Sequence, residues 1–369
     1  AIAPATLMHA SSLDHTDQFQ GVLLGAAVGD ALGLPREGLS PIRAARMYGS
    51  RPLRHRFLFG RGMISDDTEH ACLTGQALLV AFDDENRFAH SLAWRLRGWF
   101  AAMPAALGWA TLRAMVKLWI GFSPKNSGVY SAGNGPAMRA PVIGACFADK
   151  PEKILEFIGI STRMTHTDPR ASEGALAIAL ATAHGMRHGP RGVLPEVLLD
   201  EIRRHVRNDE FRRALEQVSE QLRRNASPIE FAQALGFTKG VSGYMLHTVP
   251  AALFCWLSNP GNIERCVEDV ILLGGDADST GAIVGALAGA TAGASAIPSQ
   301  WIEGIIDWPY SIAWLKKLGG QLAARFGGNE PDGTDSGPLS LFWPAIPVRN
   351  MIFLVVALAH GFRRMLPPY

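Results

Sequence analysis

Two short stretches, far apart in the sequence, combine carboxylates with hydroxyls. One reads SDDT from Ser65 to Thr68, and the other reads DADST from Asp276 to Thr280. Ser, Thr and Asp are common at helix N-termini, where one side-chain oxygen satisfies an exposed backbone N–H, so capping is the simplest interpretation of either stretch alone. Capping needs one oxygen, however, and each stretch offers two carboxylates and at least two hydroxyls. The surplus oxygens suit hard divalent cations such as Mg²⁺.

The chemistry of such a site sets a condition on the fold. Two divalent cations roughly 4 Å apart can share bridging carboxylates and clamp the oxygens of a substrate. The metal interpretation therefore requires that the side chains of Asp66 and Asp276, which belong to opposite parts of the chain, approach each other.

The elements that must position these acids are predicted to be helices. Apolar residues recur at spacings of three and four, whereas the alternation typical of strands is nearly absent, so we expect an all-α fold. The predicted helices cover residues 17–33, 66–83, 88–101, 171–187, 209–224, 229–235, 262–272, 279–294, 300–306, 310–326 and 349–361.

Two of these helices carry glycine at every fourth position. Each helical glycine costs about 1 kcal/mol relative to alanine, so four in register need a packing reason. That spacing places them on one face, where another backbone can approach closely. The alternative, dimerisation in a membrane, does not suit segments that carry acids. The glycines are Gly21, Gly25, Gly29 and Gly33 in one helix, and Gly281, Gly285, Gly289 and Gly293 in the other.

The chain is expected to form one helical domain. We expect a flexible leader over residues 1–16, the domain over residues 17–326, and a linker with a C-terminal helical appendage over residues 327–369, because GGNEPDGTDSGP at 327–338 is rich in turn formers. The longest apolar run, residues 351–359, is shorter than the roughly 20 residues that cross a bilayer. We predict a buried terminal helix and no membrane span; an interfacial helix is the alternative, since Arg363 and Arg364 follow.

Composition narrows the class of partner. The chain has 35 Lys and Arg against 33 Asp and Glu, and this net charge of +2 gives no strong field for nucleic acid as the main partner. The 4 cysteines form no Cys-x-x-Cys pair, so neither a zinc site nor a disulfide framework is indicated. We expect a cytoplasmic monomer with a small or local ligand.

Five motifs follow one another from Gly21 to about residue 293: GVLLGAAVGDALGLPREG, SDDT, GNGPAMRAPVIG, THTDPRA and GGDADSTGAIVGALAGA. Together they resemble the ADP-ribosylglycohydrolase family, which includes dinitrogenase reductase-activating glycohydrolases and eukaryotic ADP-ribosyl-acceptor hydrolases. The resemblance implies a compact orthogonal helical bundle. It also implies metal-dependent hydrolysis of the glycosidic bond between ADP-ribose and a modified protein side chain, which releases ADP-ribose and reverses mono-ADP-ribosylation.

The same resemblance assigns a binuclear centre of two divalent cations, Mg²⁺ or Mn²⁺, to the two acid stretches. Serines stand at 65 and 279 where the family usually has threonine, which keeps the hydroxyl but loses a methyl that restricts its rotamer. The implied metal ligands are Ser65, Asp66, Asp67, Asp276, Asp278 and Ser279, with Thr280 as an adjacent hydroxyl.

Hydrolysis of a glycosidic bond calls for carboxylates in acid and base roles. The resemblance implies Asp66, Asp67 and Asp278 as catalytic residues. Glu37 is another contender because it matches a mobile glutamate of some relatives, although taken alone it is a solvated loop acid. The spacing does not choose among the four.

Substrate binding is assigned to two further motifs. Residues 131–139, SAGNGPAMR, carry neither the Walker nor the G-x-G-x-x-G fingerprint, and taken alone they form an ordinary turn. The resemblance implies a diphosphate cradle at Gly133, Asn134 and Gly135, with Met138 leading into the next helix.

Two aromatic side chains complete the implied substrate site. His166 is placed near phosphate or ribose, with a purely structural histidine as the alternative. Tyr244 is a candidate to stack on adenine, and a buried core tyrosine is equally consistent with its surroundings. His184 and His188 have the spacing of a zinc pair, but we expect them to be solvated at a helix end.

The implied partner is an ADP-ribosylated protein or another ADP-ribose derivative, with arginine as the family's commonest acceptor. Two other functions fit the same residues. A catalytically silent module would hold ADP-ribose without turnover, and a binuclear metallohydrolase would cleave the diphosphate and release AMP. The retained carboxylates favour activity, and the identity of the product separates the two enzymes.

Overall fold

The computed structural model describes residues 14–105, 107–328 and 337–369, and every regular element within these ranges is a helix. The all-α prediction is thereby confirmed. Most of the leader 1–16 and of the linker 327–338 lies outside the described residues. The α-helices are α1 His15–Gly33, α2 Pro41–Tyr48, α3 Asp66–Ala81, α4 Glu85–Ala101, α5 Trp109–Trp119, α6 Ala140–Cys146, α7 Pro151–Arg163, α8 Pro169–Gly192, α9 Pro195–His205, α10 Asp209–Arg223, α11 Pro228–Ala234, α12 Met245–Ser258, α13 Ile263–Leu272, α14 Ala277–Ala292, α15 Ser299–Glu303, α16 Ile312–Phe326 and α17 Ala345–Arg364, with short 3₁₀ helices at Leu34–Arg36 and Ala294–Ala296.

Each predicted helix is present, with its ends shifted by a few residues, but periodicity alone misses α2, α5, α6, α7, α9 and α12. α6 and α12 are buried along most of their length, so they lack the polar face that makes a helix visible in a sequence. In α12 an internal proline, Pro250, further masks the helical pattern.

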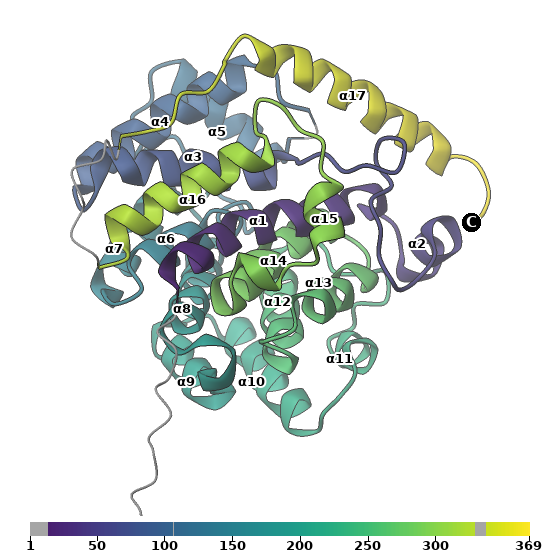
Figure 1. Cartoon of the computed structure of the whole chain (residues 1–369). Coiled ribbons are helices and arrows are strands. Elements are labelled where there is room, and N and C mark those ends of the chain that lie inside the picture. Colours follow the sequence, from purple (N-terminus) through teal and green to yellow (C-terminus); the bar gives the residue numbers. More distant parts are fainter. Residues whose placement is uncertain (1–13, 106, 329–336) are drawn as a thin grey trace, which may run out of the picture.

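The glycine-bearing helices α1 and α14 lie side by side at the centre of the molecule (Figure 1). Their glycine faces are in direct backbone contact, because a Cβ added to Gly25 would overlap the carbonyl of Gly285, and one added to Gly29 would overlap the carbonyl of Gly281. Gly21 meets Gly289 in the same way, so the two helices run in opposite directions. This close crossing is the packing reason that the glycine spacing predicts.

The antiparallel crossing determines where the acids lie. The C-terminal end of α1, which carries Asp30 and continues toward Glu37, is beside the N-terminal end of α14, which carries Asp276 and Asp278. α3 packs against both helices, and its own N-terminus begins at Asp66. Three helix ends that are distant in sequence thus meet on one side of the domain.

One member of the histidine pair on α8 differs from the prediction, whereas His188 is exposed as expected. His184 is buried rather than solvated, and the backbone N–H of Leu194 donates a hydrogen bond to its Nε2. The helix continues past His188 to Gly189, whose φ of 61° introduces a kink before Pro190. This kink brings the following segment back over the His184 ring, which a reading of helical periodicity does not reveal.

α17 also differs from the prediction of a buried terminal helix. It is 20 residues long, with a mean hydropathy of 1.6 over its apolar window, and by length and composition it could cross a membrane. Only 28% of that window is buried. The inner face lies on the domain (Figure 1), where Arg349 forms ion pairs with Glu69 and Asp307, both 2.8 Å long. The outer face is apolar and exposed.

Candidate active site

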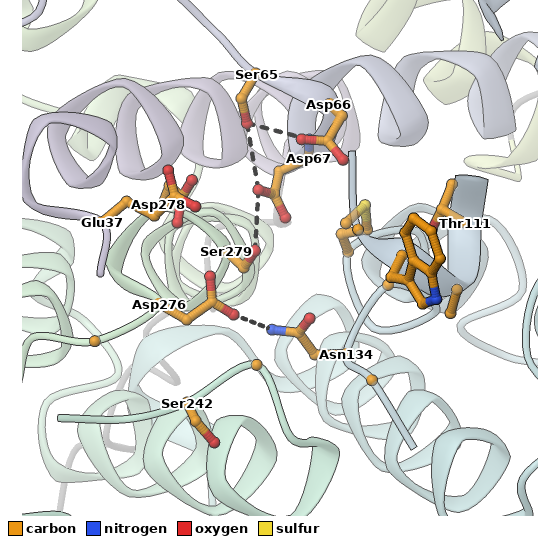
Figure 2. Close-up of a pocket in the computed structure, with 18 of the residues that line it drawn as sticks. Glu37, Ser65, Asp66, Asp67, Thr111, Asn134, Ser242, Asp276, Asp278 and Ser279 are labelled. Carbon is orange, nitrogen blue, oxygen red and sulfur yellow. Dashed lines mark hydrogen bonds between the residues drawn. The ribbon is translucent and has the colours of Figure 1, made fainter. Parts of the chain in front are cut away.

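The two acid stretches meet in one pocket. The Ser279 hydroxyl on α14 donates a 3.1 Å hydrogen bond to Oδ2 of Asp67 on α3, and the Ser65 hydroxyl lies 3.3 Å from the same oxygen. Figure 2 shows Asp66, Asp276 and the neighbouring acids directed around a common space. The cavity has a volume of about 570 Å³, which suits a small-molecule ligand. The condition that the metal interpretation sets on the fold is therefore met.

Helix capping does not account for the carboxylates. At the start of α3 the cap is Ser65, whose side chain accepts a hydrogen bond from the backbone N–H of Asp67. At the start of α14 the cap residue is Asp276, but no side chain there makes a capping hydrogen bond. Asp276 instead accepts a 2.6 Å hydrogen bond from the Asn134 side chain. The surplus oxygens thus face the pocket.

Glu37 belongs to the same site. It lines the cavity beside Asp278 (Figure 2), at the end of the short 3₁₀ helix that follows α1. Backbone bonds from Gly38 N–H to the Gly275 carbonyl (2.7 Å) and from Gly275 N–H to the Leu39 carbonyl (2.8 Å) fasten this loop to the start of α14. The loop that carries Glu37 is therefore held next to the second acid stretch.

Asp30 is a further acid whose role the motifs do not reveal. It is fully buried behind the pocket and accepts hydrogen bonds from Ser65 N–H (2.8 Å), Thr68 N–H (3.3 Å) and the Thr68 hydroxyl (2.5 Å). Burial raises its pKa to about 6. Asp30 thus fixes the turn that presents Asp66 and Asp67. Its sequence signal is a single acid in the apolar, glycine-rich stretch 21–33 of α1.

The pocket carboxylates destabilise one another. Burial, reinforced by neighbouring acids, raises the pKa of Asp67 and of Asp278 well above the ordinary value. The pKa of Asp66 is also raised well above it, by burial and then by Asp30, and the pKa of Glu37 is raised by burial and then by Asp276. An arrangement of this kind favours protons or bound cations over free carboxylates.

The residues present fit hard divalent cations. Oδ1 of Asp67 and Oδ1 of Asp278 are buried without any hydrogen-bond partner, which leaves one oxygen of each acid available as a ligand. All the donors in the pocket stretches are carboxylates and hydroxyls, the set that Mg²⁺ and Mn²⁺ take. Among the described residues no three His, Cys, Asp or Glu side chains are already arranged around one ion position, so binding requires side-chain rotation.

One predicted hydroxyl ligand points elsewhere. Thr280 is fully buried, its hydroxyl donates a 2.7 Å hydrogen bond to the Asp276 carbonyl within α14, and it does not line the pocket. Ser279, one residue earlier, does line it. The geometry therefore leaves Ser279 as the hydroxyl of this stretch that faces the cavity.

The glycine loop forms the opposite wall. Gly133, Asn134, Gly135 and Met138 all line the cavity. The backbone N–H of Asn134 already donates to the Gly243 carbonyl at 2.9 Å, and its side-chain NH₂ bonds to Asp276 and to Thr248. Asn134 therefore ties the glycine loop to the acid cluster, and its backbone N–H is not free for a phosphate.

His166 lines the same wall and is held from behind. Its Nδ1 lies 2.9 Å from the Thr165 hydroxyl, which in turn accepts a 2.8 Å hydrogen bond from Arg139. Because the Thr165 hydroxyl already accepts from Arg139, its own proton is available to Nδ1, and the matching tautomer carries the ring proton on Nε2, on the side of Gly133 and Gly135. Burial, and then the Arg139 charge, lower the pKa of His166 to about 3, so the ring is neutral at physiological pH.

Arg139 supplies a buried positive charge beneath the glycine loop. Its side chain is fully buried, and its hydrogen-bond partners among the described residues are neutral groups on His70, Ser161 and Thr165. Burial lowers its pKa to about 10, which still leaves it protonated at neutral pH. A buried guanidinium without a carboxylate partner favours an anion on this side of the pocket.

Tyr244 does not line the cavity. Its hydroxyl accepts a 3.0 Å hydrogen bond from Arg170 and donates one of 3.2 Å to Glu210, outside the pocket. The cavity wall instead contains Trp109, which is 72% exposed, and Thr111. Both come from α5, a helix that the sequence does not reveal. No chemical signature marks these two residues in the sequence.

The chain is similar to known proteins along most of its length. A family model described as ADP-ribosylglycohydrolase matches residues 11–332. The chain is similar to an uncharacterised protein of Archaeoglobus fulgidus, with 32% identity over 79% of this chain and 92% of the relative. It is 27% identical to the ADP-ribosyl-[dinitrogen reductase] glycohydrolase of Rhodospirillum rubrum over 78% of this chain and 90% of that protein. It is also 26% identical to ADP-ribosylhydrolase ARH3 of Xenopus tropicalis, over 82% of this chain and 94% of that protein.

A solved structure gives a consistent result. A chain described as part of an "ADP-ribosylglycohydrolase-related protein complex" superposes with a TM-score of 0.63 at 28% identity, and covers 84% of this chain and 97% of its own length.

Proposed function

Because this chain belongs to the ADP-ribosylglycohydrolase family, we propose that it hydrolyses the glycosidic bond joining ADP-ribose to a modified protein side chain, with arginine as the acceptor. The observation that carries the proposal is the convergence of the α3 and α14 acid ends in one pocket, opposite a glycine loop backed by a buried cation. The names of two relatives, an ADP-ribosyl-[dinitrogen reductase] glycohydrolase and an ADP-ribosylhydrolase, support the same bond type.

The metal part of the proposal concerns the acid side of the pocket. Two divalent cations, Mg²⁺ or Mn²⁺, would orient the ribose hydroxyls and lower the pKa of an attacking water. The residues that would hold them are those facing the cavity: Ser65, Asp66, Asp67, Asp276, Asp278 and Ser279. Asp30 and Asn134 position this set, since each bonds directly to part of it.

The substrate's anionic part is assigned to the opposite wall. His166 is neutral at physiological pH because its pKa is about 3, and in the tautomer that carries the proton on Nε2 it donates a hydrogen bond to a phosphate oxygen. Gly133 and Gly135 leave the His166 ring accessible from the cavity, since a Cβ on either residue would press against that ring. The buried charge of Arg139 complements a diphosphate here.

Glu37 is the carboxylate that we assign to proton transfer. Asp67 and Asp276 are hydrogen-bonded to neighbouring side chains, whereas no hydrogen bond from another described side chain holds the Glu37 carboxylate. Burial, and then the nearby Asp276, raise its pKa above the ordinary value, which is the direction that a proton-transferring carboxylate needs. Asp66, Asp67 and Asp278 then serve mainly as ligands.

The test uses the full chain with arginine-linked and serine-linked ADP-ribosyl proteins, in the presence of Mg²⁺, Mn²⁺ or EDTA, and identifies the released product by mass spectrometry. We expect intact ADP-ribose from the arginine-linked substrate, and no release with EDTA. Release of AMP would show a diphosphate-cleaving enzyme. Binding without release would show a silent ADP-ribose module, and preferential release from serine would overturn the acceptor assignment.

A further inference from the structure

The outer face of α17 is a continuous apolar surface. Val348, Met351, Ile352, Val355, Leu358 and Phe362 recur at spacings of three and four, and each is exposed, from 50% for Ile352 to 65% for Phe362. No charged side chain interrupts this face before Arg363. Exposed apolar surface of this extent marks a contact with a partner or a membrane.

The inner face fixes α17 in this orientation. The buried Arg349 binds Glu69 and Asp307, and the Asn350 side chain donates a 2.8 Å hydrogen bond to the Ala102 carbonyl. Phe353 is buried against Phe57. If α17 spanned a bilayer, it would have to leave these contacts, and the buried carboxylates of Glu69 and Asp307 would lose their positive partner. The helix is therefore built to lie on the domain with its apolar side outward.

A basic segment lies beside the second half of α17. Residues 38–65 contain Arg43, Arg46, Arg51, Arg54, Arg56 and Arg61 and no Asp or Glu, and residues 337–369 also contain no acid. Two hydrogen bonds join the segments: His360 Nε2–H donates to the Phe57 carbonyl (2.8 Å), and the Tyr48 hydroxyl donates to His360 Nδ1 (3.1 Å). Arg54 and Arg56 are exposed, and neither forms an ion pair with any residue that the structure describes.

Aromatic side chains frame the same surface. Phe59 is fully exposed at the tip of the basic loop, next to Phe57, which stacks on His360 of α17. At the other end, Phe342 and Trp343 precede the helix and are 60% and 47% exposed. Aromatic rings at the edges and arginines along one side are the features with which an amphipathic helix lies in a lipid interface.

We propose that the outer face of α17, together with Phe59 and the neighbouring arginines, docks this protein onto the surface of an anionic lipid bilayer. The apolar side chains enter the boundary between headgroups and acyl chains, and Arg54, Arg56 and Arg363 contact lipid phosphates. A second copy of the chain fits less well, because a two-fold interface would bring two acid-free, arginine-bearing surfaces together. α17 lies beyond residues 11–332, so the proposal does not depend on the family's reaction.

The test is co-sedimentation of the full chain with vesicles of phosphatidylcholine alone or mixed with phosphatidylglycerol. We expect binding to the mixed vesicles that weakens as salt increases. V355E/L358E should lose the binding, and R54E/R56E should reduce it by about tenfold or more. The matched control is V197E/I229E, which places the same charges at exposed apolar positions of α9 and α11, far from α17 (Figure 1), and should bind like the wild type.

Three outcomes would overturn the proposal. The first is no sedimentation with either vesicle. The second is binding that V355E/L358E retains while circular dichroism shows all variants folded. The third is association that resists alkaline carbonate, which would mean that α17 spans the bilayer. Analytical ultracentrifugation addresses the rival occupant, because a dimer that V355E/L358E dissociates would assign this face to a second copy.

Discussion

The Ser279 hydroxyl donates a hydrogen bond to Asp67 across 212 positions of sequence, and this bond joins the first turn of α14 to the first turn of α3. Each partner belongs to a stretch of acids whose carboxylates repel one another, so the bond holds together two helix ends that charge alone would separate. The pocket is thus a strained arrangement of like charges, and cations would relieve the strain.

Removal of one of these charges should raise the stability of the metal-free protein and lower enzymatic activity. In Asp278→Asn the metal-free protein should be more stable than the wild type, because repulsion with Glu37 and Asp276 is lost. Turnover should fall at least about a hundredfold. Differential scanning fluorimetry and single-turnover assays measure the two effects. The exposed Asp200→Asn is the control that should change neither.

The same repulsion predicts how pH and metal act together. The folded-state pKa of each pocket carboxylate is raised, so the folded protein binds more protons than the unfolded chain, and metal-free stability should rise as pH falls from neutrality. Saturating Mg²⁺ should raise the melting temperature at pH 7 and reduce this dependence. A melting temperature that is identical with Mg²⁺ and with EDTA would contradict the metal site.

The contact between α1 and α14 should tolerate no side chain. Gly25→Ala places a methyl on the Gly285 carbonyl, and we expect a loss of about 3 kcal/mol or more in the free energy of unfolding. Gly159→Ala, in the middle of α7, meets no atom within 4 Å and should be neutral or stabilising by up to about 1 kcal/mol. Urea unfolding of the two variants tests the difference.

Removal of Arg349 should destabilise the fold, because two buried acids, Glu69 and Asp307, would lose this positive partner. We expect Arg349→Met to lower the free energy of unfolding by about 3–5 kcal/mol. It should also lower kcat, since Arg349 bonds the Ile64 carbonyl next to Ser65. Arg224→Met breaks an exposed pair with Glu220 and should cost about 0.5 kcal/mol or less. Equal effects of both variants would contradict this role for Arg349.

His184 should make the protein sensitive to acid. Burial, and then charge on His188, lower its pKa to about 4 from the usual 6.5, so the unfolded chain binds the proton first. The stability associated with neutral His184 is complete above pH 6.5 and is lost as pH falls toward 4, by at most about 3 kcal/mol. His184→Gln should reduce the acid-induced fall in melting temperature, measured with Mg²⁺ present at each pH.

Several features of the fold could be predicted because their cause is local or periodic. The four-residue glycine spacing has one physical explanation in a soluble helix, and it predicts the backbone contact of α1 with α14. The acid stretches offer more oxygens than capping needs, which marks them as candidate ligands before their convergence is known. Helices with a clear apolar stripe, such as α10 and α13, are visible for the same reason.

The features that escape prediction depend on tertiary contacts. In the sequence Asp30 is one acid within the glycine-rich part of a helix, and only its hydrogen bonds with Ser65 and Thr68 reveal its positioning role. Trp109 and Thr111 reach the cavity because α5 packs beside it, and their types carry no signal. In α17 the apolar run suggests burial, but just one side finds a partner on the domain.

The direct backbone contact between α1 and α14 also determines how a bulky substrate can enter the pocket. Neither helix can slide or turn against the other without driving carbonyl groups into glycine Cα atoms, so the wall that they form with Asp278 is immobile. Admission of a whole modified protein, and escape of the freed sugar nucleotide, must therefore depend on the opposite rim, where Trp109, the glycine loop and Ser242 are the parts that can yield.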